Sequence, residues 1–172
     1  MPLAESNSRD KVSPMLSIRA ATVNDVKLLR TFIRELAEYE NELDQVLITE
    51  EILARDGFGP QPKFRVLFAY WGDQPAGYAL FFDFYSTWIG RQMFLEDLFV
   101  REAFRGKKIG RGLFAAVARI ATSEGCHALR WEVLNWNKTA IQFYESLGAE
   151  FLDTWRLTLL RDDKLRELAE SA

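Results

Sequence analysis

Hydrophobic residues recur at helical spacing in several parts of the chain. The first run follows Thr22 and Asp25, a plausible capping pair, and predicts a helix that ends near the acidic stretch YENELDQ. Thr49 predicts the cap of a second, short helix that stops at GFGP. Two further amphipathic helices are predicted, one ending at Gly125 and one, in NKTAIQFYESLG, ending at Gly148. A last helix is expected near the C-terminus.

Strand-like segments lie between these helices. LSIRAA predicts a short opening strand, and FRVLFAYW, AGYALFFDFY and RQMFLEDLFV predict an antiparallel meander, because Gly72-Asp73 and Ile89-Gly90 separate them as turns. ALRWEVL predicts another strand, and EFLDTWRLTLL a last strand or strand pair. The order of elements indicates a mixed α/β fold in which a strand–helix–strand unit brings two strands together in parallel.

Length and composition favour one folded domain. Residues 1–14 are polar and aperiodic and predict a disordered lead-in, whereas residues 15–172 predict a single domain; Met15 is an alternative start. The chain of 172 residues has a net charge of −3, which argues against a surface made for nucleic acid. Cys126, the one cysteine, fits a reducing cytoplasm, and no zinc-ligand spacing, membrane span or signal peptide is expected.

The stretch FRGKKIGRG, residues 104–112, concentrates positive charge on flexible backbone. It follows a predicted strand and opens a predicted helix, whose first N–H groups form an anion site. Glycines let the backbone approach a ligand closely, and lysine and arginine add charge. Neither G-x-x-x-x-G-K-[ST] nor G-x-G-x-x-G is present, but R-x-x-[GK]-x-G is. A solvated basic turn or an RNA-contacting patch is the alternative.

LEDLFVREAFRGKKIGRGLF, followed by EVLNWNKTAIQFYESLGA, resembles the acetyl-CoA-binding core of the GNAT acetyltransferases. IRELAEYE, DGFG and STWIG are similar to the diamine and thialysine N-acetyltransferase branch. The resemblance implies the GNAT fold, with a mostly antiparallel sheet, a parallel strand pair around the cofactor and flanking helices. It implies acetyl-CoA as acetyl donor, no metal, and these cofactor-binding residues: Leu98, Phe99, Val100, Arg105, Gly106, Lys107, Lys108, Ile109, Gly110, Arg111, Gly112, Asn137 and Tyr144. Lys108 stands where many relatives have glycine.

Two residues are candidates for the chemistry. Strand alternation puts Glu96 on the side of Leu98 and Val100, opposite Asp97, and the resemblance implies that Glu96 takes the proton of the amine. A strand-end carboxylate paired with a structural cation is the alternative for Glu96. The resemblance implies that Tyr144 stabilises the departing thiolate, in a direct transfer within a ternary complex, although an aromatic at helical spacing also fits a plain core role. Asn137 also fits a helix cap.

The resemblance implies that the acceptor is the primary amine of a small substrate, namely a diamine, a polyamine or a thialysine-like or lysine-like amine, and carboxylates and an aromatic residue are available for its cation. The candidate substrate-binding residues are Glu40, Trp88, Glu96 and Asp97. Polyamine-specific relatives carry an aspartate two residues before the tryptophan of FYSTWIG, where this chain has Ser86, so the resemblance is to members that prefer thialysine or lysine-like amines.

Other functions stay open at this point. Acetylation of protein lysines or other amines is one, and a non-catalytic acyl-CoA-binding module is another. The resemblance implies a homodimer, in which WRLTLL offers an edge for pairing. The lone cysteine, the acidic net charge and the lack of a long apolar run lead us to expect a cytoplasmic protein with no nucleic-acid or membrane partner.

Overall fold

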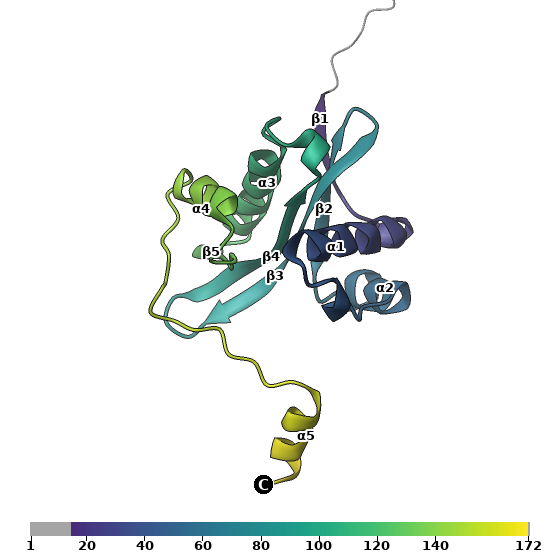
Figure 1. Cartoon of the computed structure of the whole chain (residues 1–172). Helices are drawn as coiled ribbons and strands as arrows, with labels where there is room; N and C mark the ends of the chain where they lie inside the picture. Colours follow the sequence, from purple (N-terminus) through teal and green to yellow (C-terminus); the bar gives the residue numbers. More distant parts are fainter. Residues whose placement is uncertain (1–14, 172) are drawn as a thin grey trace, which may run out of the picture. The chain divides into compact units, whose positions relative to one another are not determined.

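The computed structural model describes residues 15–171, so the predicted disordered lead-in, residues 1–14, lies outside the described residues. A five-stranded sheet in the order β1-β2-β3-β4-β5 forms its centre (Figure 1). The strands are β1 (Leu16–Ala20), β2 (Arg65–Trp71), β3 (Gln74–Ser86), β4 (Gly90–Val100) and β5 (Ala128–Trp131). Neighbours from β1 to β4 pair antiparallel, and β4 pairs with β5 in parallel. The predicted mixed α/β class, meander and parallel pair are confirmed.

Helices cover both faces of this sheet. The helices α1 (Val26–Glu40) and α2 (Glu50–Phe58) share one hydrophobic cluster with the sheet, and α3 (Ile109–Ser123) shares the other. In the first cluster the buried ring of Phe32 stacks on Phe68 and Tyr78, at centroid distances of 5.8 and 5.4 Å. In the second, Leu113 of α3 is fully buried. Burial on both faces explains why the central strands contain near-continuous apolar runs.

The predicted caps and turns are present. The Asp25 carboxylate accepts hydrogen bonds from the Thr22 amide and hydroxyl, in a 3-10 turn (Val23–Asp25) that leads into α1. Thr49 Oγ1 accepts from the Ile52 amide at the start of α2. Gly125, just beyond α3, adopts a left-handed φ of 74°, a conformation that glycine reaches at little cost. These local signals therefore predicted the helix boundaries well.

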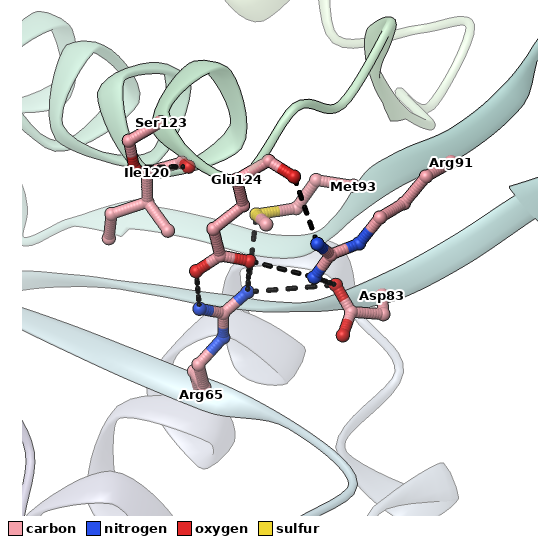
Figure 2. A network of polar contacts seen from close by, with 7 residues as sticks. All are labelled: Arg65, Asp83, Arg91, Met93, Ile120, Ser123 and Glu124. Carbon is pink, nitrogen blue, oxygen red and sulfur yellow. Dashed lines mark hydrogen bonds and ion pairs between the residues drawn. The ribbon is translucent and has the colours of Figure 1, made fainter.

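A polar network ties the C-terminal end of α3 to three strands (Figure 2). Arg65 of β2 forms a two-pronged ion pair with Glu124, directly after α3. Arg91 of β4 donates to Glu124 Oε2 and to Asp83 Oδ1, at 2.9 Å each. Hydrogen bonding from Arg65 lowers the pKa of Glu124. The network fixes the C-terminal end of α3. The other end of α3 adjoins the basic loop, the stretch FRGKKIGRG of residues 104–112.

The chain divides into two compact units, of which the first ends at Glu132 and the second begins at Val133. The second unit contains α4 (Lys138–Glu145) and α5 (Asp162–Glu170), as the helical patterns predicted. The strand predicted in EFLDTWRLTLL is wrong, because residues 150–160 form no strand. An isolated strand leaves its backbone groups unpaired, and no strand of the described residues pairs with this segment. The single domain predicted for residues 15–172 stays a prediction.

Candidate active site

The parallel pair of β4 and β5 is short, so in the described residues the second half of β4 has one edge whose backbone groups pair with no strand. The two strands pair from Gln92↔Ala128 to Leu95↔Trp131, whereas β4 continues beside β3 as far as Gly77↔Val100. Within the described part of the chain, the second half of β4 therefore pairs on one side only. Free backbone groups at such an edge can hydrogen-bond an extended ligand. Leu98, Phe99 and Val100, which were predicted to bind the cofactor arm, lie in this half.

A β-bulge changes which way the carboxylates of β4 point. Leu80 faces Asp97 and Phe81 faces Leu95, so Glu96 is the extra residue. Leu95 belongs to the cluster on the α3 face, whereas Asp97 bonds Tyr78 of the cluster on the α1 face. Strict alternation would put Asp97 on the side of Leu95, two positions away, and the extra residue breaks it, so that Asp97 lies on the α1 side of β4.

Two acidic side chains, Glu96 and Glu40, act on a third, the buried Asp97. Burial raises the pKa of Asp97 to about 7; a hydrogen bond from Tyr78 lowers it, and the charges of Glu96 and Glu40 raise it further. Burial, and the nearby charge of Glu132, also raise the pKa of Glu96. Glu40, the last residue of α1, has its pKa raised by burial and by Glu42. The region is therefore short of positive charge.

None of these three carboxylates has a cationic partner in the part of the chain that the structure describes. Among residues 15–171, Glu40, Glu96 and Asp97 take part in no salt bridge. A paired structural cation, the alternative for Glu96, is thus not found in the described residues. Carboxylates held together without counter-charge are costly, and a cationic ligand would relieve that cost.

The basic loop lies between the end of β4 and the start of α3. Gly106 and Lys108 have left-handed φ values of 77° and 61°, and Ile109, the first residue of α3, is buried in the core. Lys108 therefore occupies the conformation for which glycine is suited. A Cβ built on Gly106 would meet no atom within 4 Å, so the space beside it is open. The loop presents its backbone to solvent at a helix N-terminus.

The charged side chains of the loop are exposed, and two of them contact aromatic rings. Arg105 lies over the ring of Tyr39, at 4.8 Å, and its Nε donates to the Val100 carbonyl at 3.2 Å. Lys107 lies over Trp71 at 5.3 Å. Arg111 is exposed on the first turn of α3. These contacts hold two cations near the end of β4, beside the predicted cofactor site.

Gly110 and Gly112 have different surroundings. A Cβ on Gly110 would lie 3.7 Å from Val100 Cγ2, which is ordinary contact. A Cβ on Gly112 would come within 3.0 Å of Leu16 and 3.3 Å of Ile18. Gly112 therefore allows α3 to approach β1, a packing role that the motif alone did not reveal.

Sequence reasoning missed the residue that anchors the loop. Arg101, directly after β4, donates from Nε and Nη2 to the Glu35 carboxylate, at 2.7 Å each, and from Nη1 to the Pro75 carbonyl at 2.7 Å. Its guanidinium also lies 4.4 Å from the centre of the Phe32 ring. Arg101 thus ties the start of the loop to α1 and to β3. An arginine at a strand end was the only signal, and nothing in the sequence pointed to its partner.

Trp88 lies at the tip of the β3–β4 hairpin and is 83% exposed. Its amide donates to Ser86 Oγ at 3.2 Å. Five steps along the ladder separate the pair Ser86↔Gly90 from Phe81↔Leu95. At about 3.4 Å a step, this is roughly 17 Å. The structure therefore does not bring Trp88 beside Glu96 within one chain.

Asn137 and Tyr144 belong to the second unit. Asn137 Oδ1 accepts from the Ala140 amide at 3.2 Å, which confirms the predicted cap of α4. Tyr144 is buried and its ring lies 5.3 Å from that of Phe143. Their roles toward cofactor and substrate stay predictions.

Two absences were found in the described residues. No group of three or more histidine, cysteine or acidic side chains there is arranged to hold a metal ion. Likewise, none of the helices in that part of the chain is both long and apolar enough to cross a membrane.

A sheet whose parallel pair opens beside a cationic helix start suits an extended ligand that carries an anionic group. The chain belongs to the Acetyltransferase (GNAT) family, whose sequence model matches residues 28–149. It is an N-acetyltransferase, and this family uses acetyl-CoA as acetyl donor. The predicted family, fold and enzyme class are confirmed.

Relatives cover most of the chain. It is 41% identical over 163 residues to the thialysine N-epsilon-acetyltransferase of Sus scrofa, an alignment that covers 88% of this chain and 96% of the relative. It is 33% identical to the human spermidine/spermine N(1)-acetyltransferase-like protein 1, over 88% of this chain and 23% of that protein. Among solved structures, an integron cassette protein from V. cholerae superimposes with a TM-score of 0.74 at 28% identity, covering 90% of this chain and 98% of the other.

Proposed function

We propose that this enzyme transfers the acetyl group of acetyl-CoA to the primary amine of a small, cationic, lysine-like substrate. The observation that carries the proposal is the pair of neighbouring carboxylates at the bulge in β4, Glu96 and Asp97, which form no salt bridge in the described residues. Glu40, at the end of α1, adds a third carboxylate to their surroundings. Such a site attracts an ammonium group and repels anions.

The residues present fit coenzyme A. The space beside Gly106 is open, the loop cations are exposed, and the backbone of β4 is free along one edge in the described residues. The backbone of residues 105–110 would hold the diphosphate, and that of Leu98, Phe99 and Val100 the extended arm. When bound, acetyl-CoA supplies an acetyl thioester that an uncharged amine can attack. A nearby carboxylate is needed because that amine arrives protonated.

The amine must lose a proton before it can react. A lysine-like ammonium has a pKa near 10.4, so at pH 7 deprotonation costs roughly 4–5 kcal/mol. Glu96 is proposed to accept this proton, directly or through water, because burial and Glu132 raise its pKa and make it a better base. Tyr144 is proposed to donate a hydrogen bond from its hydroxyl to the departing sulfur, a role supported by its place in the family motif.

Thialysine or a related amino acid is the proposed acceptor, in preference to a long polyamine. The 41% identity to a thialysine N-epsilon-acetyltransferase supports this choice. So does Ser86, since it removes a charge that polyamine-specific relatives carry near the tryptophan. Ornithine is a further candidate, since a segment is 42% identical over 94 residues to the L-ornithine N5-acetyltransferase NATA1 of Arabidopsis thaliana.

Initial rates of thiol release from acetyl-CoA test this proposal. The acceptors compared are thialysine, lysine, ornithine, putrescine and spermidine. Lysine analogues acetylated on the side-chain nitrogen are the controls, because they lack the free side-chain amine. We expect turnover that depends on the amine, with the highest kcat/KM for thialysine. A folded enzyme that turns over none of these amines would contradict the proposed function.

We also propose that the enzyme is a cytoplasmic homodimer without nucleic-acid or membrane partners. Alternating apolar residues in the second unit support pairing between copies, because Trp155, Leu157 and Leu159 are all exposed. The hairpin tip adds the exposed Tyr85 and Trp88. Light scattering after size exclusion is expected to give twice the mass of 19.9 kDa. A monomer at micromolar concentration would contradict the dimer.

A further inference from the structure

A tyrosine hydroxyl holds one of the two active-site carboxylates in place. The Tyr78 side chain is fully buried between α1 and the sheet, and its ring stacks on Phe32 at 5.4 Å. Its hydroxyl donates to Asp97 Oδ2 at 2.8 Å. Among the described residues Tyr78 is the hydrogen-bond partner of this carboxylate, which leaves Oδ1 without a donor. One oxygen is therefore fixed and the other can accept a proton.

The groups around Asp97 increase its affinity for a proton. Three elements supply them: Tyr78 on β3, Glu96 on β4 and Glu40 on α1. Every charge among them is negative. Elsewhere in the chain two partly buried carboxylates pair with arginine, Asp25 with Arg19 and Glu35 with Arg101. Asp97 lacks such a pair in the described part of the chain, so its setting suits proton exchange better than structural support.

The resulting basicity is matched to neutral pH. Burial, with smaller contributions from Glu96 and Glu40, raises the pKa of Asp97 to about 7 from the usual 3.8. This corresponds to about a thousandfold higher proton affinity than that of an ordinary aspartate. A base whose pKa lies near the working pH combines a large ionised fraction with a useful driving force.

We propose that Asp97 is a second proton acceptor for the amine, acting with Glu96, and that Tyr78 is its positioning residue. The inference rests on the proposed function and deepens it. An N–H bond of the substrate ammonium breaks, and the proton forms an O–H bond at Asp97 Oδ1, directly or by way of Glu96. The electron pair stays on the amine nitrogen, which becomes the nucleophile. The proton leaves to solvent once the acetylated product has gone.

The pH dependence of kcat/KM for the amine tests this proposal. For the wild type we expect an acidic limb with its midpoint near pH 7. Tyr78→Phe removes a hydrogen bond that stabilises the Asp97 carboxylate, so its midpoint should move upward by about one pH unit. The matched control is Tyr70→Phe, since Tyr70 also loses a hydroxyl but bonds Arg19 instead. Its midpoint should stay that of the wild type.

Asp97→Asn keeps the test decisive if Tyr78→Phe fails to fold. We expect kcat to fall about a hundredfold, the limb near pH 7 to disappear, and KM for the amine to change less than fivefold. The inference would be overturned if Asp97→Asn kept the acidic limb near pH 7 and a kcat within threefold of the wild-type value. So would an unmoved midpoint in well-folded Tyr78→Phe.

A measurement without turnover separates this inference from the proposed function. The carboxyl carbon of Asp97 can be titrated by NMR in the wild type and in Tyr78→Phe. Titration near pH 7, shifted upward in the variant, would support the Tyr78–Asp97 pair whichever amine is the substrate. Titration near pH 4 would overturn the inference and leave acetyl transfer through Glu96 intact.

Discussion

Lys108 adopts a backbone conformation that costs a lysine more than a glycine. Its φ of 61° lies in the left-handed region, which favours glycine. Lys108→Gly is therefore expected to raise the free energy of unfolding by about 1 kcal/mol. Lys107→Gly is the matched control, since Lys107 is not among the residues with positive φ and should gain nothing. Urea denaturation measures the free energy of unfolding of both variants. A lower value for Lys108→Gly than for the wild type would contradict backbone strain at Lys108.

Asp97 is expected to reduce stability at high pH. Its pKa is raised to about 7 in the folded chain, so its favourable contribution is complete below about pH 4 and is lost as the pH rises through 7. Asp97→Asn should therefore raise the free energy of unfolding by about 1–3 kcal/mol at pH 8.5, and by less at pH 5. The exposed turn residue Asp73 offers a control in Asp73→Asn. Urea denaturation that shows equal gains at both pH values would argue against a raised pKa.

At the scale of single residues, the sequence motifs predicted which residues belong to the candidate site better than they predicted which way the side chains point. Glu96 and Asp97 were predicted as candidates from the strand pattern and the resemblance. The bulge at Glu96, which turns Asp97 away from the side of Leu95, depends on how β3 pairs with β4, and a period of two cannot reveal an extra residue. Tyr78 was missed as a partner because 19 positions separate it from Asp97.

Among the elements, the junction of β4 and the basic loop depends on a single arginine. Arg101 joins α1 and the start of β3 through three hydrogen bonds to Glu35 and Pro75. Arg101→Ala should lower the free energy of unfolding by about 1–3 kcal/mol, because it leaves the partly buried Glu35 unpaired. Arg119→Ala, on the exposed side of α3, is the control and should change stability by less than about 0.5 kcal/mol. Equal effects of the two substitutions in urea denaturation would contradict the anchoring role.

Helices and most strands were predictable because their signals are local. Caps at Thr22 and Thr49 and stops at Gly125 and Gly148 use neighbouring residues only. The strand expected in EFLDTWRLTLL was wrong, although its alternation was clear. A strand needs a partner, and the sequence pattern of one segment cannot supply it.

On the scale of the whole molecule, the first unit contains the sheet, the carboxylates and the basic loop. The second unit contains Asn137 and Tyr144, whose roles toward cofactor and substrate stay predictions. The fold class and the order of most elements followed from the sequence. The sequence predicted only some of the side-chain contacts in the candidate site, because those contacts join residues that are far apart in the chain.

A crystal structure of the enzyme with coenzyme A tests the central claim most directly. The account predicts the diphosphate on the amides of residues 105–110, the extended arm along Leu98, Phe99 and Val100, and the sulfur near Glu96. A ligand bound elsewhere, with the turn before α3 left empty, would contradict the account.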